Sequence, residues 1–140
     1  DLAAYEGFPD GPKLTAEDLV EDGFNSKHPW FFVLLAEKNG EILGSALCNR
    51  AYSSWSRRAF YIEDLYVLPK ARRMGIGLLL MKALCKAAVE EGVHRMDWHV
   101  LKSNASALSF YNHLGARDLR VTEGRTMLRL DRDRIEALAS

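Results

Sequence analysis

The stretch Val67-Leu68-Pro69-Lys70-Ala71-Arg72-Arg73-Met74-Gly75-Ile76-Gly77 decides how this sequence folds. It follows an apolar and aromatic run at 59–68 and precedes apolar residues that recur at helical spacing up to Ala88. This order predicts a strand, a short basic loop with two glycines, and a long helix. Glycine lets a backbone approach a ligand closely, and the N–H groups and dipole of a helix N-terminus attract anions. The loop is therefore a candidate site for a pyrophosphate.

Two other phosphate-binding motifs fit this loop poorly. A Walker A motif requires the string Gly-x-x-x-x-Gly-Lys-Ser/Thr, which the sequence does not contain. The dinucleotide fingerprint requires a third glycine at position 80, where the chain has Leu80. Taken from these residues alone, the loop is explained equally well as a glycine hinge beside a solvated basic patch.

The rest of the chain predicts a mixed α/β fold. Asn39-Gly40 is typical of a tight hairpin turn, and Thr15 to Asp18 resembles a capped helix start. Residues 1–6 are expected to end a helix, and further helices are expected at 76–90, 104–114 and 131–139. Strands are expected at 30–37, 41–51, 59–68, 94–101, 117–119 and 125–130. This order favours an antiparallel first half followed by a βαβ unit.

Composition restricts the classes of function. The 140 residues are 48% apolar and 27% charged, which is typical of one globular domain spanning 1–140. Lys plus Arg and Asp plus Glu both number 19, so we expect no nucleic-acid partner, and no apolar run is long enough to cross a membrane. Cys48 and Cys85 cannot form a disulfide framework or a zinc site and fit a reducing compartment. The scattered histidines predict no metal site.

The motif Arg72-x-x-Gly75-x-Gly77, between a strand and an amphipathic helix, resembles the acetyl-CoA motif of the GNAT superfamily of N-acetyltransferases. Asn104, Ala107, Phe110-Tyr111 and Leu114-Gly115-Ala116 resemble the second cofactor motif of that family. Strings along nearly the whole chain are most similar to its diamine (spermidine/spermine) and thialysine acetyltransferases. They are Tyr5-Glu6, Leu14-Thr15-x-x-Asp18-Leu19, Glu21-Asp22-Gly23-Phe24, His28-Pro29, Tyr61-Ile62-Glu63-Asp64-Leu65-Tyr66-Val67, Gly115-Ala116-x-Asp118-Leu119 and Glu123-Gly124.

The resemblance implies the GNAT fold, in which helices flank a mixed, mostly antiparallel central sheet. The first strand of that fold and the start of its first helix would precede Asp1, so we expect a single, N-terminally trimmed domain. The resemblance also implies a homodimer, in which the C-terminal strands contribute to the partner's site, and a cytoplasmic location.

The cofactor implied by the resemblance is acetyl-CoA. Its pyrophosphate would be held through backbone N–H groups of the loop, made of Arg72, Arg73, Met74, Gly75, Ile76, Gly77 and Leu78. Its pantetheine would pair like an extra strand with Leu65, Tyr66 and Val67, where one N–H would polarise the thioester carbonyl. Its far side would contact Asn104, Ala105, Ser106 and Ala107, and Tyr111 would lie against it.

The implied reaction is direct transfer of acetyl to a primary amine in a ternary complex. Tyr111 would protonate the departing thiolate, and Glu63 would deprotonate the ammonium, directly or through water. The alternatives are that Tyr111 only packs its helix and that Glu63 is an exposed strand carboxylate. Asp64 is expected to be structural, since neighbours on a regular strand face opposite sides, although the family carries a bulge near this point. Cys85 is expected to be buried, which leaves no acetyl-cysteine intermediate.

The expected substrate is the amine of a small polyamine or diamine. Residues at substrate-side positions of the family are Tyr5, Glu6, Glu63, Asp97, Trp98, His99 and Glu123. Glu6 and Glu123 would neutralise distal ammonium groups, and Tyr5 or Trp98 would offer a cation–π face. Both carboxylates are explained equally well as ordinary surface charges.

Two departures from the subfamily bring positive charge. Ser53 stands near an acidic position, and Arg125 stands where an aromatic residue is expected; Arg50, Arg57 and Arg58 add further cations. A cationic wall would suit a carboxylate-bearing amine, such as lysine or thialysine.

Two further hypotheses concern the acceptor and the activity itself. The acceptor could be a protein or peptide amine, for which the fold would need a groove that admits a backbone. The chain could also be a non-catalytic acyl-CoA-binding module, but the presence of both Tyr111 and Glu63 argues against that class.

Overall fold

The computed structural model describes residues 14–140, so Tyr5, Glu6 and the helix end expected at 1–6 lie outside the described residues. The chain divides into two compact units, with the boundary between Leu101 and Lys102. The described elements of the first unit are α2 (Ala16–Val20), a π-helix (Glu21–Asn25), β1 (Phe32–Lys38), β2 (Glu41–Ser53), β3 (Arg57–Val67), a 3₁₀ turn (Pro69–Ala71), α3 (Ile76–Glu90) and β4 (Arg95–Trp98). Those of the second are α4 (Ala105–His113), α5 (Leu119–Glu123) and α6 (Arg132–Ala139).

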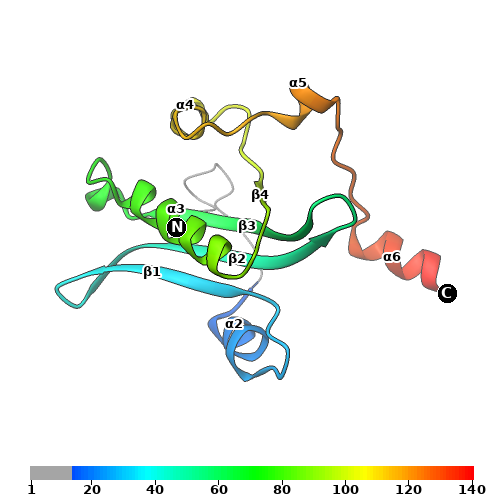
Figure 1. Ribbon diagram of the computed structural model, residues 1–140. Coiled ribbons are helices and arrows are strands. Elements are labelled where there is room, and N and C mark those ends of the chain that lie inside the picture. Colours follow the sequence, from blue (N-terminus) through cyan, green and yellow to red (C-terminus); the bar gives the residue numbers. More distant parts are fainter. Residues whose placement is uncertain (1–13) are drawn as a thin grey trace. The chain divides into compact units, whose positions relative to one another are not determined.

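The first unit is built on a four-stranded sheet in the order β1-β2-β3-β4. The first three strands are antiparallel, and β4 runs parallel to β3 after the α3 crossover (Figure 1). Asn39 and Gly40 both have left-handed backbone angles, with φ of 53° and 78°, as a two-residue hairpin requires. The antiparallel first half and the βαβ unit are therefore confirmed, although β4 is shorter than the strand predicted at 94–101.

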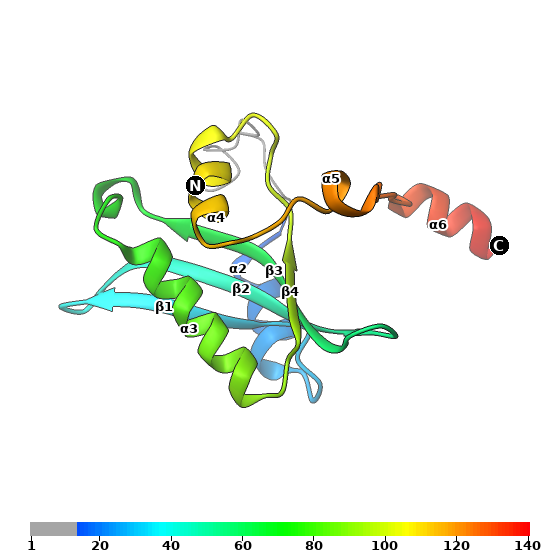
Figure 2. The ribbon, with the colours of Figure 1, turned by 45° about the horizontal axis from the view of Figure 1, so that its top comes forward.

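Helix α3 lies across one face of the sheet (Figure 2). Its buried residues are Ile76, Leu80, Met81, Leu84 and Ala88, and the strands bury Leu43, Ala46, Cys48, Phe60 and Ile62. Gly44 allows the close approach, because a Cβ there would lie 3.2 Å from Ile76 Cγ2 and 2.9 Å from the Tyr66 carbonyl oxygen. The expectation that Cys85 is buried is wrong: Cys85 is exposed, since it follows Leu84 around the helix and turns away from the sheet.

The C-terminal end of α3 is tied to β2 and β3 by charge. Arg50 donates two hydrogen bonds to the Glu91 carboxylate, at 2.7 and 3.0 Å, and Arg58 donates to the Glu91 carbonyl oxygen at 2.8 Å. Arg50 and Arg58 are two of the arginines expected to add positive charge near a substrate. Both lie at the C-terminal end of α3, away from the glycine loop. The 15 residues of α3 separate the two ends by about 22 Å.

We expect Glu91→Gln to destabilise the fold by about 0.5–1 kcal/mol at pH 7, an amount kept small because 37% of the Glu91 side chain is exposed. Arg50 holds the pKa of Glu91 below its ordinary value of 4.5. The folded state therefore binds protons less readily than the unfolded state, and the contribution is present above pH 4.5 and disappears as the pH falls through the lowered pKa. Urea unfolding at pH 7 and pH 3 measures this, with Glu90→Gln as the matched control. An equal loss at both pH values would contradict it.

The second unit is helical throughout its regular structure. Asn104 caps α4 by accepting from the Ala107 N–H at 3.1 Å, and Gly115 follows the helix with a φ of 89°. Asp118 caps α5 in the same way, accepting from the Arg120 N–H at 2.9 Å. Helices predicted at 104–114 and 131–139 are confirmed as α4 and α6.

The strands predicted at 117–119 and 125–130 are wrong. The Asp118 cap and the left-handed Gly124, with φ of 64°, bound a helical turn instead of a strand. Residues 125–130 run without regular structure, and within residues 14–140 they pair with no strand. An apolar pattern predicts which residues suit a strand, but a strand forms only where a partner satisfies its backbone groups.

Candidate active site

The glycine loop has the geometry of an anion site. Gly75 is the N-cap of α3 and has a φ of 76°, a left-handed angle that disfavours any side chain, and a Cβ built there would meet nothing within 4 Å. Gly75 supplies no capping side chain, so the N–H groups of Ile76, Gly77 and Leu78 lack the acceptors that a preceding turn would give them. Buried Ile76 fixes this first turn against the sheet. The arrangement favours a bound anion.

The two arginines of the loop differ in their surroundings. Arg72 is half-buried, donates from Nε to the Val67 carbonyl oxygen at 3.1 Å, and lies 5.7 Å from the centroid of the Tyr66 ring. Arg73 is exposed and has a φ of 66°. Arg72 thus fixes the loop to the end of β3, while both guanidinium groups raise the positive potential at the N-terminus of α3.

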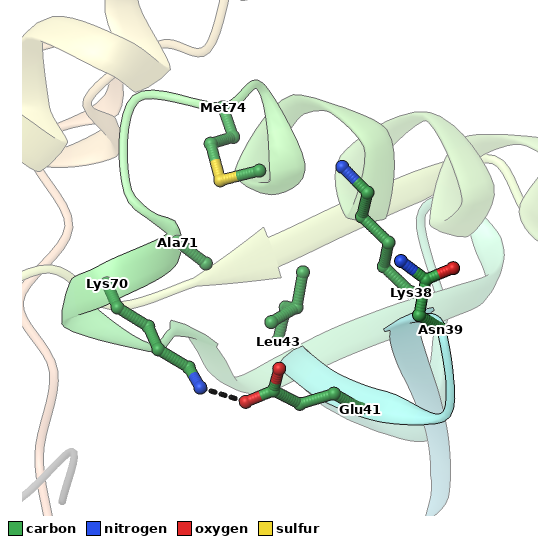
Figure 3. A pocket seen from close by; sticks show the side chains of 7 residues that line it. All are labelled: Lys38, Asn39, Glu41, Leu43, Lys70, Ala71 and Met74. Carbon is green, nitrogen blue, oxygen red and sulfur yellow. Dashed lines mark hydrogen bonds and ion pairs between the residues drawn. The ribbon is translucent and has the colours of Figure 1, made fainter.

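A pocket of about 250 Å³ lies between the β1–β2 hairpin and the start of the loop (Figure 3). The Lys70 ammonium forms an ion pair with the Glu41 carboxylate across it. The other residues that line this pocket are Lys38, Asn39, Leu43, Ala71 and Met74. The ion pair holds the 3₁₀ turn against the hairpin, so Lys70 serves the placement of the loop.

Strands β3 and β4 pair only over a short length. The parallel ladder begins at Ala59–Arg95 and ends at Ile62–Trp98, and within the described part of the chain nothing extends it along Leu65 to Val67. The Leu68 N–H donates to the Leu43 carbonyl oxygen on β2 at 2.9 Å. Backbone groups alternate sides along a strand, so those of Leu65 and Val67 point away from β2, toward the edge that β4 has left. Within the described part of the first unit these backbone groups have no strand partner, which pairing with an extended ligand requires.

A β-bulge marks the point where the two strands part. On the β2 side, Ile62 pairs with Cys48 and Asp64 pairs with Leu47, which leaves Glu63 as the extra residue. Glu63 is exposed, whereas Asp64 is half-buried and partnered. The bulge expected from the family resemblance is present, and it places Glu63 directly after the last β3–β4 pair, where the gap between the two strands begins.

The residues expected to contact the far side of a cofactor lie in the second unit. Asn104 and Ala107 are half-buried and bonded to each other, while Ala105 and Ser106 are exposed in the first turn of α4. Tyr111 is half-buried on the same helix, with its ring centroid 5.3 Å from that of Phe110. Asn104, Ala107 and Tyr111 therefore share one folded helix, as the motif requires.

The expected substrate residues of the first unit gather at the end of β4. Asp97 accepts from Arg95 Nε at 2.9 Å, Trp98 forms the last pair of the ladder, and the His99 imidazole is hydrogen-bonded to the Tyr61 hydroxyl. Sequence reasoning missed Tyr61, because its contact with His99 depends on the register of two strands 38 residues apart.

Glu123, in the second unit, is held between two arginines. Its carboxylate accepts from Arg125 Nε at 2.7 Å and from Arg117 Nη1 at 2.6 Å. Arg125 first, and then Arg117, lower the pKa of Glu123 below its ordinary value. The cluster carries one net positive charge. Arg117 was also missed, since nothing in its sequence neighbourhood pairs it with Glu123.

Other chemistries find little support in the described residues. Burial raises the pKa of the Cys48 thiol to about 12, so this sulfur is not a thiolate at neutral pH. Within residues 14–140 no three His, Cys, Asp or Glu side chains are grouped to hold a metal ion. None of the described helices has the length and apolar character needed to cross a membrane.

These features agree with what comparison with known proteins shows. The model of the acetyltransferase (GNAT) family matches residues 3–116, and the chain belongs to this family. It is therefore an acyltransferase enzyme, of a family whose members generally take acetyl-CoA as donor and pass its acetyl group to amines.

Named relatives lie close in sequence. The chain is 36% identical over 147 aligned positions to the thialysine N-epsilon-acetyltransferase of Sus scrofa, covering 99% of this chain and 86% of that protein. It is 33% identical to the spermidine/spermine N(1)-acetyltransferase-like protein 1 of Homo sapiens, covering 99% of this chain and 21% of that one.

Solved structures share the fold. The integron cassette protein VCH_CASS6 from the mobile metagenome of V. cholerae superposes with a TM-score of 0.78 at 26% identity, over 99% of this chain and 85% of that one. The expected α/β fold with a mixed sheet flanked by helices is thereby confirmed.

Proposed function

We propose that this chain transfers the acetyl group of acetyl-CoA directly to the primary amine of a small molecule. The observation that carries the proposal is the edge of β3 beyond Ile62, which β4 does not pair with and which leads to the glycine cap of α3. One end of this path offers backbone groups to an extended chain, and the other offers N–H groups and positive charge to a pyrophosphate. When bound, acetyl-CoA would supply the thioester carbonyl that the amine attacks.

Each candidate residue has a defined task in this proposal. The backbone N–H groups of Leu65 and Val67 pair with the pantetheine and polarise the thioester carbonyl oxygen. Glu63, at the bulge, orients the substrate ammonium and takes its proton, directly or through water. Tyr111 is the acid: a tyrosine hydroxyl is a proton donor at neutral pH, and a departing thiolate needs one. In this proposal the transfer to the amine is direct.

We infer that the amine belongs to a lysine-like compound with its own carboxylate. The charge of Glu123 is already balanced by Arg117 and Arg125, so the cluster repels a second ammonium and attracts a carboxylate. The names of the relatives include both a thialysine and a spermidine/spermine acetyltransferase, and this cluster favours the former class.

The test is a competition among amines at equal concentration. Thiol release from acetyl-CoA is followed with thialysine, lysine, spermidine and putrescine, and the acetylated products are separated by chromatography. We expect the products of the lysine-like amines to dominate. Dominance of acetylspermidine would replace this substrate class by the polyamines, and transfer only to an added peptide would replace it by a protein substrate.

Replacing Arg125 tests the role of the cluster. We expect Arg125→Gln to raise KM for thialysine about tenfold and to leave KM for spermidine unchanged or lower. The substrate carboxylate loses one of its two arginine partners, and the negative charge of Glu123 is then balanced by Arg117 alone. Steady-state kinetics with both amines measures the shift. Arg132→Gln removes an arginine that pairs with Glu136 in α6 and is the control. Equal changes for both amines in Arg125→Gln would contradict the assignment.

A homodimer also belongs to the proposal. Met127, Leu128 and Leu130 are exposed in the segment without regular structure that follows α5. Apolar side chains gathered on an exposed segment are suited to contact with a second copy of the chain.

A further inference from the structure

The hydrogen bond between Tyr61 and His99 lies where β3 and β4 separate. Tyr61 is opposite Asp97 in the parallel ladder, and Ile62–Trp98 is the last pair. His99 directly follows this pair on one chain segment, as Glu63 does on the other. These two side chains therefore flank the opening of the gap, and the His99 imidazole is held there by the Tyr61 hydroxyl at Nδ1.

The bond defines what the other nitrogen of His99 can do. When Nδ1–H donates to the Tyr61 oxygen, Nε2 carries a lone pair and is a proton acceptor. His99 is exposed, so its imidazole is accessible from solvent. His94 begins the same segment of chain, and its N–H donates to the Arg58 carbonyl oxygen at 3.0 Å, at the far end of the ladder.

We propose that His99 is a proton acceptor for the amine substrate, and that Tyr61 is its positioning residue. The inference rests on the proposed acetyltransferase function. An N–H bond of the substrate ammonium breaks, its electron pair remains on the amine nitrogen, and the proton bonds to Nε2 of His99. The neutral amine then forms a C–N bond with the thioester carbonyl carbon as the C–S bond breaks. The departing thiolate takes the proton of Tyr111, the acetylated nitrogen gives its surplus proton to the tyrosinate, and the imidazolium returns its proton to solvent. In this refinement of the proposed function, Glu63 orients the ammonium from β3, and His99 replaces Glu63 as the acceptor of its proton.

Basicity favours His99 over Glu63 as the final proton acceptor. A free alkylammonium has a pKa near 10.4, a free imidazole near 6.5 and a free carboxyl near 4.3, so the imidazole is the stronger base by about two pKa units. Proton transfer to it is therefore about 100-fold less unfavourable than transfer to a carboxylate.

The test combines NMR with pH-dependent kinetics. Long-range ¹H–¹⁵N spectra of the free protein report the tautomer of each histidine, and the His99 signals are identified by their loss in His99→Gln. We expect the Nδ1–H form in the wild-type chain and its loss in Tyr61→Phe. We expect His99→Gln to lower kcat/KM about 100-fold at pH 7, and to remove the fall in kcat/KM that the wild type shows between about pH 8 and pH 5. His94→Gln is the matched control.

The outcomes separate two kinds of failure. If the wild type transfers acetyl groups and His99→Gln keeps the same pH profile and a rate within about twofold, the role of His99 is overturned while the proposed function stands. An Nε2–H tautomer in the wild type also overturns it. If the wild type acetylates no amine at all, the proposed function fails, and the role of His99 fails with it.

Discussion

Changing Tyr111 to Phe is expected to lower kcat for acetyl transfer about 100-fold, while KM for acetyl-CoA changes less than about twofold. The substitution removes one hydroxyl and keeps the ring, which lies 5.3 Å from the Phe110 ring within α4. General acid catalysis contributes about 10²–10⁴-fold, and the loss affects only the step in which the thiolate departs. Rates of thiol release at saturating amine give kcat directly.

Two comparisons make the Tyr111 result specific. Tyr52→Phe removes a hydroxyl from a side chain that is 75% exposed on β2, and we expect it to leave kcat unchanged. Thermal unfolding of both variants measures any common loss of stability. If Tyr111→Phe keeps the kcat of the wild type, the hydroxyl is not the acid, and Tyr111 serves only to pack α4.

Changing Gly75 to Val is expected to weaken binding of CoA about 30-fold. A β-branched residue at φ of 76° is strained, so the cap of α3 has to shift and its first-turn N–H groups turn away from the pyrophosphate. An added side chain would also enter open space at the N-terminus of the helix, where the anion binds. Isothermal titration with CoA measures this without any turnover.

The turn that follows α3 offers a matched control for Gly75. Gly92 has a similar backbone angle, with φ of 69°, and the nearest atom to a Cβ there is Arg58 Nη1 at 3.5 Å, an ordinary contact. Gly92→Val therefore carries a similar conformational strain, of order 1–2 kcal/mol, at the opposite end of α3 from its first turn. If both variants bind CoA equally well, the glycine loop is not the pyrophosphate site.

The sequence predicts those parts of the fold that depend on neighbouring residues. The Thr15–Asp18 capping box forms with reciprocal hydrogen bonds of 2.9 and 3.1 Å, because both partners lie within one helical turn. The Asn39-Gly40 turn and the glycine caps at Gly75 and Gly115 likewise need only local backbone conformations. For the same reason, the strand–loop–helix unit around Gly75 is recognisable from its motif alone.

The parts that could not be predicted depend on partners distant in sequence. Residues 125–130 have an apolar pattern suited to a strand, yet no pattern states whether another strand lies beside them. Cys85 belongs to an apolar run, but its exposure follows from how α3 is rotated on the sheet. In the site, the Tyr61–His99 bond and the arginines around Glu123 require a tertiary register that residue types do not encode.

Transfer of a labelled acetyl group tests the proposed reaction most directly. The chain is incubated with [¹³C]acetyl-CoA and thialysine, and the amine is analysed by mass spectrometry and NMR. We expect thialysine acetylated on its side-chain nitrogen, formed in equal amount to the CoA released, with no acetylated protein as an intermediate. Binding of CoA without labelled product from thialysine, lysine, spermidine or putrescine would contradict the proposed reaction and leave an acyl-CoA-binding module or an enzyme for another acceptor.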